Sequence, residues 1–105
     1  MTITVFENVR QIDPASGRDG VGRLTVEDGR IAAIDSPETP EGACVIDGQG
    51  AVLCPGLVDM RVALGEPGFE YRESVKSGAR AAVAGGITTM AVLPNTSPAI
   101  DNPAL

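Results

Sequence analysis

The residues best suited to ion chemistry in this sequence are three glutamates that follow a short apolar stretch. Glu66, Glu70 and Glu73 could together bind a cation, because carboxylate oxygens are good ligands for hard metal ions. The sequence contains no histidine, which is the usual metal ligand and the usual general base near neutral pH. We therefore favour a simpler interpretation, in which these glutamates belong to a solvated loop and to the first turn of a helix, where negative charge suits the helix dipole.

Two further polar residues could contact a small ligand. Arg61 could bind an anion, but a lone charge on a strand more often pairs with a nearby carboxylate, and we favour a pair with Asp59 or Glu66. Asn95 could bind a small molecule through its amide, or it could cap the turn after Pro94, since asparagine suits turn positions. The sequence leaves these two alternatives for Asn95 equally open.

Composition argues against several classes of function. The formal net charge of −6 argues against non-specific binding to nucleic acid and to an anionic membrane surface. No apolar run approaches the roughly 18 residues of a membrane span, and the first residues lack the pattern of a signal peptide, so we expect a cytoplasmic protein. In that setting Cys44 and Cys54 are expected to be reduced and buried, rather than joined in a disulfide.

The elements that would position these residues fall into two parts. Residues 1–54 predict a small antiparallel β unit, with strands at 2–6, 9–12, 24–26, 30–34, 44–46 and 51–53. Asn8 is expected to begin a turn, and Asp28-Gly29 is typical of a tight hairpin whose two central residues both need positive φ. A unit of this size buries little apolar surface, so we expect it to need something to pack on.

Residues 55–105 predict one βαβ unit. Apolar residues on both faces indicate a strand at 57–64, helical spacing predicts a helix over 70–84, and a β-branched run indicates a strand at 87–93. Gly85-Gly86 is expected to end the helix rather than to approach a phosphate, and residues 95–105 are expected to form a loop. The two strands are expected to lie parallel. At 105 residues the chain is too short for a complete eight-stranded barrel, which needs roughly 250 residues.

Several motifs resemble one group of enzymes. The sequence reads EDGRIAAI at 27–34, PGLVDM at 55–60, EPG at 66–68, GGITT at 85–89 and PNT at 94–96. Together they resemble the amidohydrolase superfamily, and its dihydroorotase branch in particular, over nearly the whole chain. The resemblance implies an α/β fold, in which residues 1–54 form the amino-terminal part of a small β domain. Residues 55–105 would form the first two strands of an incomplete TIM (β/α)8 barrel.

The resemblance also implies where the functional residues of the family would lie. The two histidines that bind the catalytic metal, zinc in the active family, correspond to Arg61 and Ala63, and the arginine that clamps the substrate carboxylate corresponds to Gly65. Arginine has no lone pair for a cation and alanine has no donor atom, so we expect no catalytic residue and no metal in this chain. Asn95 matches the asparagine that contacts substrate in the family, and Asp59 matches a supporting residue.

The resemblance therefore implies a dihydroorotase-like pseudoenzyme of pyrimidine biosynthesis, inactive as this chain alone. Family members that lack the metal ligands act as non-catalytic partners of aspartate carbamoyltransferase, so we expect an oligomer or a complex with that enzyme or with the rest of a barrel. The alternative is the amino-terminal fragment of a full-length dihydroorotase or hydantoinase-type cyclic amide hydrolase. A third and weaker hypothesis is a small ligand-binding module around Arg61 and Asn95.

Overall fold

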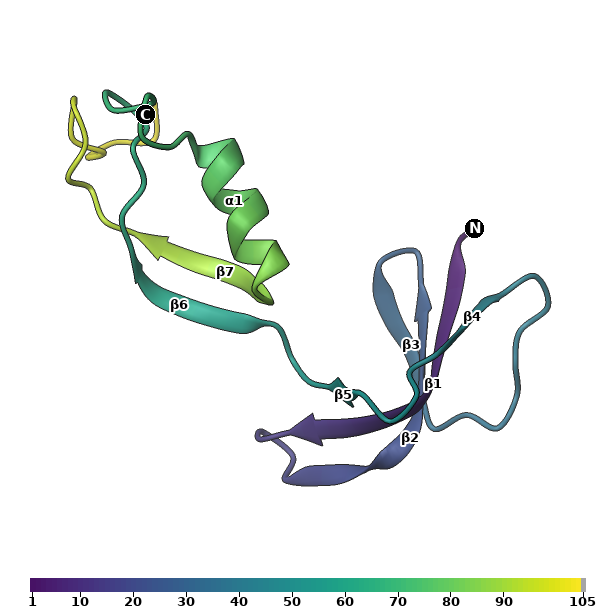
Figure 1. Ribbon diagram of the computed structural model, residues 1–105. Coiled ribbons are helices and arrows are strands. Elements are labelled where there is room, and N and C mark those ends of the chain that lie inside the picture. Colours follow the sequence, from purple (N-terminus) through teal and green to yellow (C-terminus); the bar gives the residue numbers. More distant parts are fainter. Residues whose placement is uncertain (105) are drawn as a thin grey trace. The chain divides into compact units, whose positions relative to one another are not determined.

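The protein folds as two units, each with its own sheet (Figure 1). A computed structural model describes residues 1–104, and the chain divides into Met1–Pro55 and a second unit that starts at Gly56. Residue 105, the last of the expected carboxyl-terminal loop, lies outside the described residues. No helix within residues 1–104 is both long enough and apolar enough to cross a membrane.

Three antiparallel strands form the centre of the first unit. β1 (Ile3–Asp13) pairs with β2 (Arg18–Glu27), and β2 pairs with β3 (Arg30–Ile34). The turn between β2 and β3 is formed by Asp28 and Gly29, with φ of 49° and 77°, as this pair predicts. Val5 is fully buried and Val9 nearly so, which places the small core of this unit along β1.

Two short strands correct the prediction that the first unit is wholly antiparallel. β4 (Cys44–Asp47) and β5 (Val52–Leu53) both run parallel to β1 and pair with different halves of it. Asn8 does not begin a turn, because it lies at a bulge inside the continuous strand β1, with φ of 55° and a shift of register. The segment between β4 and β5 lies against this bulge, because the Gly50 N–H donates to the Asn8 carbonyl at 2.8 Å.

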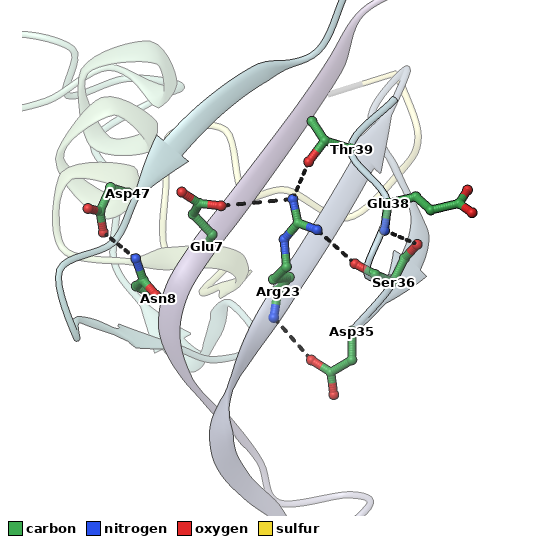
Figure 2. A network of polar contacts seen from close by, with 8 residues as sticks. All are labelled: Glu7, Asn8, Arg23, Asp35, Ser36, Glu38, Thr39 and Asp47. Atoms are coloured by element: carbon green, nitrogen blue, oxygen red, sulfur yellow. Dashed lines mark hydrogen bonds and ion pairs between the residues drawn. The ribbon is translucent and has the colours of Figure 1, made fainter. Parts of the chain in front are cut away.

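A polar network holds the segment after β3 against the sheet (Figure 2). The Asp35 carboxylate accepts hydrogen bonds from the Arg18 guanidinium, from the Arg23 backbone N–H at 3.0 Å and from the Gln11 amide at 3.2 Å. The Arg23 guanidinium donates to the Ser36 carbonyl at 2.9 Å. The hydrogen bond from Arg18, followed by that from the Arg23 backbone, holds the pKa of Asp35 below its ordinary value. The ionised carboxylate of Asp35 is therefore one of several groups that hold this segment against the sheet.

The second unit contains two parallel strands joined through one helix, as the sequence predicts. β6 (Leu57–Val62) pairs in parallel with β7 (Ile87–Val92), and α1 (Val75–Ala84) lies beside β7 (Figure 1). Gly85 ends the helix, and its N–H donates to the carbonyls of the last turn. The βαβ prediction is therefore confirmed, with both strands slightly shorter than expected.

Helix α1 begins at residue 75, later than the predicted start at residue 70. Ser74 caps it: the Ser74 hydroxyl accepts from the Ser77 N–H at 3.1 Å, while the Ser77 hydroxyl accepts from the Ser74 N–H at 3.0 Å. This reciprocal cap satisfies amide groups that have no partner inside the helix. Glu70 and Glu73 therefore precede the helix and belong to the loop after β6, instead of forming the first helical turn.

Cys44 and Cys54 are free thiols, as expected, but both are exposed. The prediction that they are buried is wrong. β4 is the last strand in the sheet order β3-β2-β1-β4, so only one of its edges is paired, and all four of its residues are exposed. Cys54 follows the two-residue strand β5, where the chain leaves the first sheet.

Candidate functional site

A small cavity lies where β6 and β7 end. Because these strands are parallel, their carboxyl ends meet at one edge of the sheet, where the Leu93 N–H donates to the Val62 carbonyl at 2.8 Å. Open α/β sheets place their ligands outside this edge. The cavity has a volume of about 240 Å³, and its lining consists of residues that follow the two strands: Ala63, Leu64, Gly65, Phe69, Arg72, Glu73 and Asn95.

The loop after β6 folds tightly over Gly65. The Phe69 N–H donates to the Gly65 carbonyl at 2.6 Å, and the Arg72 N–H donates to the Phe69 carbonyl at 2.9 Å. A Cβ atom on Gly65 would lie only 2.4 Å from the carbonyl oxygen of Phe69 and 2.5 Å from that of Glu73. This loop conformation therefore requires glycine at position 65, and any side chain there would displace the loop.

Arg72 brings a guanidinium to this cavity, and the sequence analysis missed it. Its Nε donates to the Tyr71 hydroxyl at 3.0 Å, and its Cζ lies 5.3 Å from the ring centroid of Phe69 and 5.5 Å from that of Tyr71. Both distances allow a cation–π interaction, and the two rings contact each other edge to face. The signal that could have found Arg72 is that two of the three aromatic residues of the chain lie within three positions of it.

Three of the positions that the family resemblance identifies line the cavity, namely Ala63, Gly65 and Asn95, and Arg61 does not. Arg61 lies within β6, before the strand ends. Its expected ion pair is wrong: the Asp59 carboxylate accepts from the backbone N–H of Arg61 at 3.1 Å, and the ion pairs found in residues 1–104 do not include the Arg61 guanidinium. The cavity therefore includes Asn95 but not Arg61.

Two of the three glutamates considered for a cation site hold the loop in place. The Glu66 carboxylate accepts from the Val75 N–H at 2.8 Å, at the start of α1, and the Glu70 carboxylate accepts from the Gly68 N–H at 3.1 Å. Glu73 lines the cavity without the other two. In the part of the chain that the structure describes, no three side chains of His, Cys, Asp or Glu gather as metal ligands would. The loop interpretation is therefore confirmed for Glu66, whereas Glu70 and Glu73, expected in the first helical turn, lie before the helix.

The metal that the family resemblance implies does not fit the residues at its expected ligand positions. Zinc is held in proteins by cysteine, histidine and carboxylate side chains. Arg61 stays protonated and Ala63 has no donor atom, so neither position supplies such a ligand. The residues of this chain consequently support no chemical step through a metal at these positions.

A larger and mainly apolar hollow, of about 470 Å³, lies in the first unit. Residues of four strands line it, including Ile12, Leu24, Ile31 and Leu53. Arg18 also borders it, but this guanidinium is already paired with Asp35. The hollow therefore presents apolar surface rather than groups for catalysis, which agrees with the expectation that this unit needs something to pack on.

Known proteins match this chain at the level of sequence. Residues 50–104 match the profile of a family described as "Dihydro-orotase-like". The chain is 49% identical over 102 residues to the dihydroorotase of Pelobacter propionicus, with 96% of this chain and 24% of that protein covered. It is 46% identical over 100 residues to the dihydroorotase of Anaeromyxobacter sp. (strain K), with 94% and 23% covered. The chain thus spans about a quarter of the length of these curated relatives.

Solved structures share the fold. L-hydantoinase (dihydropyrimidinase) from Arthrobacter aurescens superposes with a TM-score of 0.79 at 28% identity, covering 94% of this chain and 22% of that one. A crystal structure of D-hydantoinase superposes with a TM-score of 0.76 at 27% identity, covering 89% and 20%. These matches confirm the expected α/β fold with the first strands of an incomplete barrel.

Proposed function

The chain belongs to the dihydroorotase-like family, and from this premise we propose that the protein is a non-catalytic member of it, a pseudoenzyme linked to pyrimidine biosynthesis. The observation that carries the proposal is the set of residues at the end of β6. Arg61 and Ala63 supply no metal ligand, and the loop closed over Gly65 leaves no room there for a substrate-clamping side chain. Metal-assisted hydrolysis needs a bound ion to activate water, and positions 61 and 63 supply no ligand for such an ion.

The role we propose in place of catalysis is structural, as a partner of aspartate carbamoyltransferase. The partner is the one that the family resemblance implies for chains without metal ligands. Apolar side chains on β6 support a role in assembly, since Val58 and Met60 are 62% and 81% exposed in residues 1–104. Exposed apolar surface of this kind is typically covered by further protein.

The test uses the whole natural gene product, purified from its host under native conditions with any proteins that accompany it. We expect no turnover of dihydroorotate above background with added zinc, and we expect transcarbamoylase activity to elute with the protein. The dihydroorotase of Pelobacter propionicus, assayed in parallel, serves as the active control. Zinc-dependent turnover near that of the control would refute the non-catalytic assignment, and absence of transcarbamoylase from the purified protein would refute the proposed partner.

A second candidate function is that of a cyclic amide hydrolase of the dihydroorotase or hydantoinase type, of which these residues form the amino-terminal part. The coverage of about a quarter of the curated relatives favours it. The same preparation separates the two candidates by intact mass together with activity. A natural chain several times heavier than 10.8 kDa that hydrolyses a cyclic amide would support this second function.

A further inference from the structure

Residues 35–43 form a strap that connects β3 to β4, and Arg23 of β2 holds this strap against the sheet (Figure 2). The Arg23 guanidinium donates to the Ser36 carbonyl at 2.9 Å and to the Thr39 hydroxyl. It also forms an ion pair with the Glu7 carboxylate of β1 at 3.8 Å. One side chain therefore joins two neighbouring strands to the strap.

The strand that follows the strap has few contacts of its own. Among the strands of residues 1–104, β4 pairs with β1 alone, and all four of its residues are exposed. Its last residue, Asp47, lies opposite Glu7, and the Gly48 N–H donates to the Glu7 carbonyl at 2.7 Å. Segments with few buried contacts open at a lower cost in free energy than the core of a sheet. We therefore expect the pairing of β4 to depend on the strap that leads into it.

The beginning of the strap is fixed separately, through the backbone of Arg23. The Asp35 N–H donates to the Arg23 carbonyl at 2.8 Å, and the Asp35 carboxylate accepts from the Arg23 N–H at 3.0 Å. The Arg18 guanidinium pairs with the same carboxylate. Replacement of the Arg23 side chain leaves these contacts in place. Asp35 can therefore act as a hinge, while the Arg23 guanidinium controls the residues that follow it.

We propose that the Arg23 guanidinium is the latch of a conformational device in the first unit. While it holds the strap, β4 stays paired with β1, and when it releases the strap, residues 36–47 turn about Asp35 and leave the sheet together. The open state uncovers the edge of β1 at residues 4–7, which β4 covers in the closed state. An uncovered strand edge offers backbone groups to which an extended segment of another chain can add. The device goes beyond the structural role proposed above and does not depend on it.

Two features keep the closed and open states close in free energy. The Arg23 Nε atom is buried and has no hydrogen-bond partner within residues 1–104, so water that enters on opening would give it one. The Arg23 and Glu7 side chains are 22% and 38% exposed, so solvent and dissolved salt weaken their attraction. The latch therefore favours the closed state without locking it.

The experiment is hydrogen–deuterium exchange of the whole natural protein, followed by mass spectrometry of peptides from the strap, from β4 and from the β2–β3 hairpin. Arg23→Gln should speed exchange in the strap and in β4 roughly tenfold or more, as expected when charge-assisted hydrogen bonds are lost. Exchange in the hairpin should change little, because its backbone pairing does not involve the Arg23 guanidinium. The matched control is Arg30→Gln, which removes the same charge from an exposed position on β3 and should leave exchange in β4 unchanged.

Thr39→Val tests the latch from the side of the strap. It removes the hydroxyl that accepts from Arg23 while leaving the guanidinium in place, and it should speed exchange in β4 several-fold. Circular dichroism melting shows whether each variant folds, and Thr39→Val carries the test if Arg23→Gln does not fold.

Unchanged exchange in β4 of the folded variant would overturn the proposal, even if exchange in the strap rises, because the two segments would then not leave the sheet together. An equal rise in β4 and in the hairpin would also overturn it, since the whole unit would then have become less stable. Neither result bears on catalysis or on the transcarbamoylase partner.

Discussion

Gly65→Ala is the substitution that tests the loop geometry most directly. The added Cβ atom would lie 2.4 Å and 2.5 Å from two backbone carbonyl oxygens, those of Phe69 and Glu73, where Cβ atoms are essentially never closer than 3.0 Å. Each oxygen would have to retreat by about half an ångström or more, and the hydrogen bond of 2.6 Å between the Phe69 N–H and the Gly65 carbonyl would be strained. Insertion of atoms into a packed site costs about 1–3 kcal/mol, so we expect a loss of that size in the free energy of unfolding.

The measurement is urea denaturation followed by circular dichroism, on the natural protein and on its variants. Gly20→Ala is the matched control, because a Cβ atom there would meet nothing within 4 Å. With no clash, alanine should leave stability unchanged or raise it by up to about 1 kcal/mol, through the reduced entropy of the unfolded chain. If Gly65→Ala proves as stable as Gly20→Ala, the loop does not close over residue 65, and the reasoning that places Arg72 at the cavity fails with it.

Two further substitutions test how the chain is held together in each unit. Asp35→Asn should make the stability of the protein less sensitive to acid. The pKa of Asp35 is lowered in the folded state by Arg18. The contribution of the Asp35 carboxylate to the free energy of unfolding is therefore complete above the unfolded pKa of about 3.9 and is lost as the pH falls through the lower folded value. The measurement is the fall in Tm between about pH 6 and pH 3. This fall should be smaller for Asp35→Asn than for the control Glu38→Gln. An equal fall in the two variants would contradict the prediction. Ser74→Ala should destabilise the protein by about 1 kcal/mol in urea denaturation through loss of the helix cap, while Ser74→Thr keeps the capping oxygen and should cost less; an equal cost would count against the cap.

The sequence was sufficient for the elements whose partners are neighbours along the chain. The hairpin at Asp28-Gly29 and the βαβ unit are both local, and turn chemistry or periodicity specifies each of them. The parallel pairing of β4 with β1 could not be predicted in this way. It joins Thr4 to Cys44 across some forty residues, and periodicity indicates a strand without indicating its partner.

The start of α1 shows a competition between two local signals. Glutamates at 70 and 73 favour a helix that begins there, but Ser74 with Ser77 forms a reciprocal cap, and Glu66 accepts from the first helical N–H. The cap satisfies backbone donors directly, so it sets the boundary, whereas charges near a helix end contribute only a general attraction. The glutamates are then left to the loop, and this determines which of them reaches the cavity.

Some residues of the candidate site could be identified from the sequence, and Arg72 could not. The family resemblance identified Ala63, Gly65 and Asn95 from the sequence, and the structure places all three at the cavity where the two strands end. The aromatic residues close to Arg72 in the sequence were a signal for a supported guanidinium. Its place at the cavity could not be predicted, because it depends on two backbone hydrogen bonds that close the loop over Gly65, and nothing in the spacing of the loop residues indicates that closure.

The glycine at position 65 and the placement of Arg72 at the cavity therefore depend on the same loop conformation. The loop that carries Arg72 occupies the space into which a side chain at 65 would extend, as the distances of 2.4 Å and 2.5 Å show. An arginine at 65 and this placement of Arg72 exclude each other, so restoring the first would remove the second rather than add to it. A positive charge at this cavity does not require an arginine directly after the strand. It requires a glycine there, a loop that turns back on it, and aromatic rings that support a guanidinium from further along the chain.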